Sequence, residues 1–165
     1  MGQGAEGVGL YRTEFLFLHQ PHFPTEDEQA ADYTAVARGA GEHGVIIRTL
    51  DIGGDKLPAG ADGPAEGNPF LGWRGIRRSL QQPELFRTQL RAILRAAAHG
   101  QVNLLVPMLG HVREIRQTLS LIDHARAQLD NRGAVYGAVK LGAMIEVPAA
   151  AIGLVTNVSV LQVRP

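Results

Sequence analysis

Val45-Ile46-Ile47-Arg48-Thr49-Leu50-Asp51 is the stretch that indicates the fold. Its three β-branched apolar residues predict a buried strand, and the polar residues behind them mark where that strand ends. The same arrangement occurs earlier, where a strand predicted over residues 7–11 runs into Arg12, and later, where a strand predicted over residues 139–145 meets Glu146. Because these strands are continuous apolar runs, both of their faces are expected to be covered, as in parallel α/β sheets.

Helices are predicted between these strands. Thr25 and Glu28 fit a capping box that opens a helix reaching about Arg38, whereas residues 15–23 read as a loop broken by two prolines. Further elements are a helix capped by Asn68, a helix from 83 to about 99, a strand over 102–106, a helix from 112 to about 131 and a small-residue helix from 148. This alternation predicts parallel strands joined by helical crossovers. A partial (β/α)8 barrel with about four strands and an open doubly wound sheet both fit.

The composition suits one globular domain with a real core. The chain has 165 residues, is 45% hydrophobic and 19% charged, and balances sixteen basic with sixteen acidic residues. This balance gives no support to nucleic-acid binding, and no apolar run reaches the ~18 residues of a membrane-spanning helix. The lack of cysteine excludes a disulfide scaffold, cysteine-ligated zinc and a cysteine nucleophile within these residues. No signal peptide is expected, so the cytoplasm is the predicted location.

Polar side chains gather where the predicted strands end. Arg12 and Glu14 follow the first strand, Arg48 and Asp51 follow the second, and Glu146 follows the last. In parallel α/β folds this edge binds ligands, so the two arginines are expected to converge on one phosphate or carboxylate. Glu146 is the natural metal ligand or acid/base group. The alternative for the first pair is an ordinary ion pair between Arg12 and Glu14.

Two further stretches hold candidate cations. Gly53-Gly54-Asp55-Lys56 follows the second strand closely and could face an anion, although it matches neither a Walker A loop nor a Rossmann fingerprint, and a plain turn is the alternative. Arg74 follows the single tryptophan, Trp73, which could be a core or an interface anchor. Arg77 and Arg78 are expected on the solvated face of a helix. The six histidines show no metal-ligand spacing.

Four segments in this order resemble Enzyme I of the sugar phosphotransferase system, the phosphoenolpyruvate (PEP)–protein phosphotransferase family. They run from Gly7 to Phe15, from Arg48 to Lys56, from Asn68 to Arg74 and from Met144 to Ala150. The match covers about residues 4–151, which we expect to form one partial barrel domain followed by a divergent tail over 152–165. Pyruvate phosphate dikinases and PEP synthases share the first and last segments, whereas the two middle segments favour Enzyme I.

The resemblance implies a PEP pocket. In that family this domain is a (β/α)8 barrel that binds PEP and Mg²⁺. By resemblance, Arg12 and Arg48 bind the phosphate and carboxylate groups of PEP, and Lys56 and Arg74 lie in the same anion-binding pocket. Glu146 is, by the same resemblance, a Mg²⁺ ligand. The chemistry agrees, because phosphoryl transfer needs positioning and charge neutralisation more than covalent help from the protein.

The resemblance also implies groups that these residues do not match. The family transfers the phosphoryl group to a histidine on a separate domain, which also docks the phosphocarrier HPr. It uses a cysteine as proton donor and an aspartate of a Gly-Thr-Asn-Asp-Leu motif as second metal ligand, and neither is found in this sequence. We therefore expect PEP binding but no catalytic residue here, and no phosphorylation of HPr by these 165 residues alone.

Two alternatives stay open at this point. A half-barrel exposes strand edges and an apolar face, so it could be a non-catalytic unit that assembles with a second copy, as a homo-oligomer, or with a partner chain. The chain could instead be part of a pyruvate phosphate dikinase or PEP synthase. Strand edges without neighbours also predict marginal stability.

Overall fold

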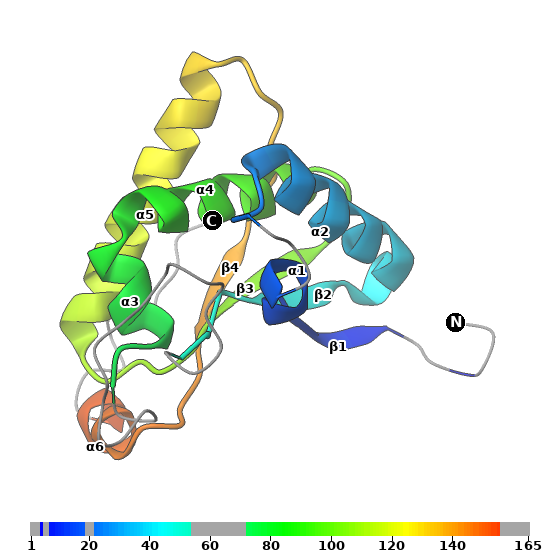
Figure 1. The fold of residues 1–165 in the computed structure, drawn as a ribbon. Coiled ribbons are helices and arrows are strands. Elements are labelled where there is room, and N and C mark those ends of the chain that lie inside the picture. Colours follow the sequence, from blue (N-terminus) through cyan, green and yellow to red (C-terminus); the bar gives the residue numbers. More distant parts are fainter. Residues whose placement is uncertain (1–3, 5–6, 19–21, 54–71, 156–165) are drawn as a thin grey trace.

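A computed structural model gives the fold and describes residue 4 and residues 7–18, 22–53 and 72–155. Four parallel strands form one sheet in the order β1-β2-β3-β4 (Figure 1). They are β1 (Val8–Arg12), β2 (Val45–Arg48), β3 (Val102–Val106) and β4 (Lys140–Ala143). Sequential strands are neighbours in the sheet, and a helix crosses over between each pair, as the alternating pattern predicts.

Three long helices cover one face of the sheet: α2 (Glu26–Ala40), α4 (Pro83–Ala96) and α5 (Val112–Asn131) (Figure 1). Their apolar sides meet the alternate strand residues Val45, Ile47 and Leu104, each no more than 1% exposed, in a single core. The predicted capping box is confirmed, because Glu28 N–H bonds to the Thr25 hydroxyl while the Glu28 carboxylate accepts from Thr25 N–H. His111 begins α5 in the same way, with Glu114 as its partner.

In the described parts of the chain, the other face of the sheet carries no long helix. Leu10 on β1 and Ile46 on β2 are apolar, yet each is 37% exposed. In the part of the chain that the structure describes, β1 and β4 do not pair with one another, so the sheet is open. An open parallel sheet with helices outside and apolar residues inside is part of a (β/α)8 barrel, which confirms the predicted fold class.

Short helices complete the connections. They are α1 (Glu14–Leu18), a 3₁₀ turn η1 (Gly41–His43), α3 (Gly75–Gln81) and α6 (Pro148–Val155). Two expectations are wrong. The start of the segment predicted as a loop is helical in α1, because buried Phe17 stacks edge-on against Phe23, with ring centroids 5.0 Å apart. Arg78 is buried rather than solvated, since its guanidinium lies 4.9 Å over the Trp73 ring.

Candidate functional site

Arg12 and Arg48 end adjacent strands at the same level. They are register partners in the parallel pair β1–β2. Partners in a parallel ladder project to the same side of the sheet, and Arg48 shares its side with exposed Ile46, two residues before it. The two predicted substrate cations therefore lie together at the carboxyl end of the sheet, on the face that the long helices leave uncovered. We call this edge the rim.

Arg48 is held in place by two carboxylates. Its Nη2 donates to Oε1 of Glu14 at 2.7 Å, and its Nη1 lies 3.6 Å from Oδ2 of Asp51. The main-chain N–H of Asp51 also donates to Glu14, at 3.2 Å. All three side chains are largely buried, with exposed fractions of 11%, 13% and 3% for Arg48, Glu14 and Asp51. Glu14 thus pairs with Arg48, whereas the expected alternative paired it with Arg12.

Arg74 joins the rim through the same aspartate. Its Nε and Nη2 donate to the two oxygens of Asp51, each at 2.9 Å. This fork geometry fixes the guanidinium plane as well as its position. Asp51 therefore holds two of the predicted substrate cations, Arg48 and Arg74, beside one another.

At the ends of β1 and β2, the rim carries more positive than negative charge. Glu14 and Asp51 balance Arg48 and Arg74, and Arg12 adds a third cation. Among the described residues Arg12 makes no ion pair, and it is exposed. A dianionic phosphate beside a carboxylate requires such an excess, which makes the rim suitable for a small anionic substrate.

Glu146 lies at the end of the next strand but one from Arg48. Its Oε1 accepts a hydrogen bond from the main-chain N–H of Met108 at 2.7 Å, and its side chain is exposed. Met108 follows β3 and has a φ of 58°, which only glycine adopts easily. Gly75, with a φ of 53°, packs against it so closely that an added Cβ would lie 2.8 Å from the Met108 Cβ. A glycine at 75 is therefore required for this arrangement.

The residues present fit a magnesium site only in part. No group of three or more histidine, aspartate and glutamate side chains comes together in the described segments. Glu146 offers one carboxylate, and Mg²⁺ commonly takes one or two carboxylates together with substrate oxygens and water. The last predicted cation of the pocket, Lys56, lies outside the described residues.

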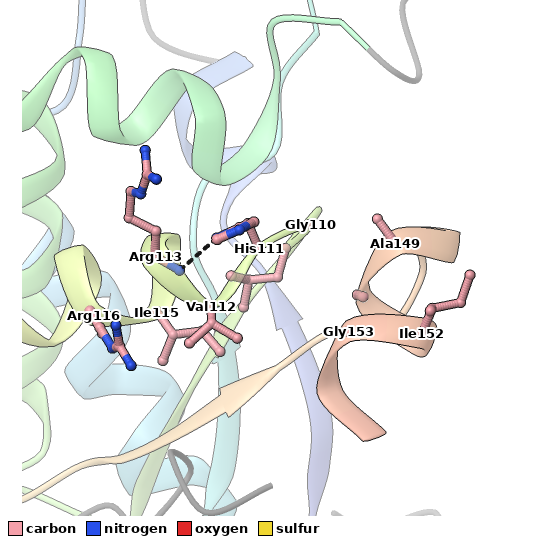
Figure 2. Close-up of a pocket in the computed structure, with 11 residues that line it drawn as sticks. Gly110, His111, Val112, Arg113, Ile115, Arg116, Ala149, Ile152 and Gly153 are labelled. Atoms are coloured by element: carbon pink, nitrogen blue, oxygen red, sulfur yellow. Dashed lines mark hydrogen bonds between the residues drawn. The ribbon is translucent and has the colours of Figure 1, made fainter. Parts of the chain in front are cut away.

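A separate pocket lies between the start of α5 and α6 (Figure 2). It has a volume of about 580 Å³, and its walls include Leu109, Val112, Ile115 and Ile152. The only dashed contact in the close-up is the hydrogen bond from Arg113 N–H to Nδ1 of His111, at 3.0 Å. None of the predicted site residues lines this apolar pocket, so it is distinct from the rim.

Sequence reasoning missed three residues that organise the rim. Gly75 directly follows Arg74, a predicted site residue. A glycine is needed at position 75 only because Met108, which is distant in sequence, packs against it. Met108 and Gln89 carried no signal, because their partners lie far away in the sequence. Gln89 bonds to both of the segments that follow the paired arginines, at Leu50 and at Thr13.

Comparison with known proteins places the chain in a family. A family model described as "PEP-utilising enzyme, PEP-binding domain" matches residues 1–159. The phosphoenolpyruvate-protein phosphotransferase of Staphylococcus carnosus is 49% identical over 149 residues, which are 90% of this chain and 26% of that protein. Those of Listeria monocytogenes and Haemophilus influenzae are 48% and 45% identical, over 92% and 90% of this chain and 27% and 26% of theirs.

The chain spans about a quarter of the length of these curated relatives. In the portion of the chain with described coordinates, no helix is both long and apolar enough to cross a membrane. The parallel strands, the rim arginines and the family match over most of the chain agree with one another. The chain belongs to the PEP-utilising enzyme family and corresponds to its PEP-binding domain.

Proposed function

We propose that this chain is the PEP-binding part of a phosphoenolpyruvate–protein phosphotransferase, and that PEP binds at the rim. The observation that carries the proposal is the register pairing of Arg12 with Arg48, which brings two arginines to one edge of the sheet. The relatives named above support the phosphotransferase over the dikinase and PEP synthase alternatives, since all three carry the phosphotransferase name.

The rim residues divide the work of holding a small trianion. Arg12, exposed and outside the carboxylate network, contacts the phosphate of PEP directly. Arg48 and Arg74 keep fixed orientations through Asp51 and bring their positive charges to the substrate. Lys56, which follows β2 in the sequence and lies outside the described residues, is proposed to add a further cation. Together these groups would neutralise the charge that limits phosphoryl transfer.

Glu146 is proposed to hold Mg²⁺. The Met108 N–H donates to Oε1 and so orients the carboxylate. The second oxygen, Oε2, would then bind the metal. When bound, the metal would draw PEP oxygens toward β4 and offset their negative charge. The other ligands would be substrate oxygens and water.

The larger protein is proposed to pass the phosphoryl group to a histidine on another domain and then to HPr, in the cytoplasm. The rim offers binding groups, and we propose that residues 4–151 form the barrel portion that carries them, with 152–165 as a divergent tail. On this proposal the 165 residues bind PEP but do not label HPr with phosphate.

Thermal unfolding with and without PEP plus Mg²⁺ tests the proposal. A ligand that binds only the folded chain at a hundred times its Kd adds about 2.7 kcal/mol of stability, which raises Tm by roughly 5–10 °C for a chain of this size. Arg12→Gln is expected to abolish most of the shift while leaving the Tm of the free protein unchanged. Pyruvate and inorganic phosphate serve as ligand controls. An unchanged Tm with PEP and Mg²⁺ would refute PEP binding by this chain.

A second candidate function rests on the uncovered face of the sheet. Leu10 and Ile46 are exposed there, and β1 and β4 each present a free edge among the described strands. Such a face favours assembly of two copies, which would make the chain a half-barrel building block. The mass in solution distinguishes the two cases, because a monomer over a wide concentration range excludes self-assembly.

A further inference from the structure

We propose that Gln89, on α4, is a positioning residue for the PEP pocket, because it binds both chain segments that carry the paired arginines and sets their relative position. The inference rests on the proposed function of the rim. Among the described residues, the hydrogen bonds of Gln89 go to none of the side chains proposed to bind PEP. It lies on the helix-covered side of the sheet, only 3% exposed, behind the ends of β1 and β2.

The side-chain amide of Gln89 uses its acceptor and both of its donors. Its Oε1 accepts from the main-chain N–H of Leu50 at 3.0 Å, and its Nε2 donates to the Thr13 hydroxyl at 3.3 Å. The second donor bond goes to the Tyr33 hydroxyl, at 3.2 Å. Thr13 directly follows Arg12, and Leu50 lies two residues after Arg48. One amide therefore connects the two arginine-bearing segments.

Each of the three residues after Arg48 is anchored by a hydrogen bond from its main-chain N–H. Thr49 N–H donates to the carbonyl of Leu105 on β3, at 2.9 Å, which continues the sheet by one step. The next N–H, that of Leu50, donates to Gln89 and not to β3. Asp51 N–H turns to Glu14, at 3.2 Å. Gln89 is therefore the middle of three consecutive anchors, and the only one that comes from a helix of the outer layer.

A second buried glutamine holds Gln89 in turn. The Tyr33 hydroxyl donates to Oε1 of Gln29 at 3.2 Å, and Gln29 Nε2 donates to the carbonyl of Pro24 at 2.8 Å. Burial raises the pKa of Tyr33 well above its ordinary value of 10.0, so this hydroxyl keeps its proton and stays a donor. The order of donors fixes which way the Gln89 amide faces, with its oxygen toward Leu50.

Gln29 also provides a matched control. Both glutamines are buried, and both form a hydrogen bond with Tyr33. The other bond of Gln29 goes to Pro24, just before α2, whereas Gln89 bonds to the segments that follow Arg12 and Arg48. Gln→Met keeps the length of the side chain and removes its hydrogen bonds. If Gln89 served only stability, Gln89→Met and Gln29→Met would have the same kind of effect.

The experiment measures the Kd of PEP in the presence of Mg²⁺ by calorimetry, at a temperature well below the Tm of every variant. Displacing a binding group by about an ångström can cost up to roughly a hundredfold. Gln89→Met is expected to weaken PEP binding about tenfold, while Gln29→Met leaves Kd within about twofold despite lowering Tm. Equal Kd values for Gln89→Met and the unmodified chain would overturn the positioning role. Failure of the unmodified chain to bind PEP would instead refute the proposed function.

A double-mutant cycle with Arg48→Lys tests whether Gln89 acts through Arg48. If it does, adding Gln89→Met to Arg48→Lys weakens binding much less than Gln89→Met does alone, because the guanidinium that Gln89 orients is already gone. Multiplicative effects of the two substitutions would overturn this route. Should Gln89→Met fail to fold, Thr13→Val removes the Thr13 hydroxyl from the same amide, and is expected to weaken PEP binding in the same direction.

Discussion

Met108 and Glu146 join the ends of β3 and β4 through one hydrogen bond, from the Met108 main-chain N–H to Glu146 Oε1 at 2.7 Å. The left-handed backbone of Met108 turns that N–H toward the neighbouring strand, where an extended residue would point it elsewhere. The carboxylate proposed as a metal ligand is therefore oriented by main chain. Main-chain donors carry no side-chain torsions, so this orientation costs little entropy.

Glu146→Gln separates the charge of this carboxylate from its hydrogen bond. The amide oxygen can still accept from Met108, so the Tm of the free protein should change little. The Mg²⁺ enhancement of PEP binding should fall by at least about tenfold, because a neutral amide is a poor magnesium ligand. Calorimetric titration of PEP with and without Mg²⁺ measures this enhancement. Glu114→Gln, which removes a carboxylate that accepts from Gly110 and His111 N–H, is the control and should keep the enhancement.

Gly75→Ala is expected to destabilise the chain by about 2 kcal/mol or more. The left-handed backbone alone costs an alanine roughly 1–2 kcal/mol, and its Cβ would lie 2.8 Å from that of Met108. Urea unfolding gives the change in the free energy of unfolding. At Gly39 in α2, an added Cβ would meet no atom of another part of the described chain within 4 Å, so Gly39→Ala should instead stabilise by about 0.5–1 kcal/mol. Effects of the same sign at both positions would contradict the packing of Gly75 on Met108.

Asp51→Asn should loosen both arginines that the aspartate holds. The carboxylate is 3% exposed and accepts two charge-assisted bonds from Arg74, and such bonds contribute about 1.5–3 kcal/mol each. An amide keeps at most one of them, so we expect a loss of about 2 kcal/mol in the free energy of unfolding. PEP binding should weaken as well, even at temperatures where the variant is fully folded. Asp123→Asn, which removes an exposed partner of Arg126, is the matched control and should leave stability within about 0.5 kcal/mol.

The ion pairs of Glu26, which join the start of α2 to α4 and to the end of α5, should weaken in acid. Burial on its own would raise the pKa of this carboxyl group, but hydrogen bonds from Arg91, Arg132 and Arg95 outweigh burial and lower the pKa below its ordinary 4.5. The unfolded chain therefore binds the proton more readily than the folded chain. The stabilisation is complete above pH 4.5 and is lost as pH falls below that value through the folded-state pKa.

Stability curves of the unmodified chain and of Glu26→Gln between pH 3 and 7, which is roughly the range over which carboxyl groups titrate, test this sign. The unmodified chain should lose stability more steeply toward low pH than the variant, so the two curves converge on acidification. Parallel curves over the whole range would show that the arginines do not favour the ionised form of Glu26.

Elements with strong local signals could be predicted from the sequence. Continuous apolar runs identified all four strands, and the polar residues behind them marked the rim, because a strand end needs no distant partner to be recognised. The capping box at Thr25 was equally local. The predicted start of a helix at Asn68 lies outside the described residues, so the position of that residue stays a prediction.

What could not be predicted depends on partners that lie far away in sequence. Gln89 lies 39 residues from Leu50 and 76 from Thr13, so nothing in its neighbourhood indicates a role. Arg78 occupies a position that charge alone assigns to solvent, and only the Trp73 ring explains its burial. Sequence spacing left open an ion pair between Glu14 and Arg12, two residues away, but the register of β1 with β2 brings Arg48 to Glu14 instead.

The three anchors on residues 49–51 also constrain the order in which the chain folds. They come from β3, α4 and the start of α1, and each lies tens of residues away in sequence from the residue that it holds. Contacts of such sequence separation require large loops to close first and therefore form slowly. The helices can form early from local contacts, but the binding edge takes its final shape only when all three segments have docked. During refolding, affinity for PEP should be the last native property to return.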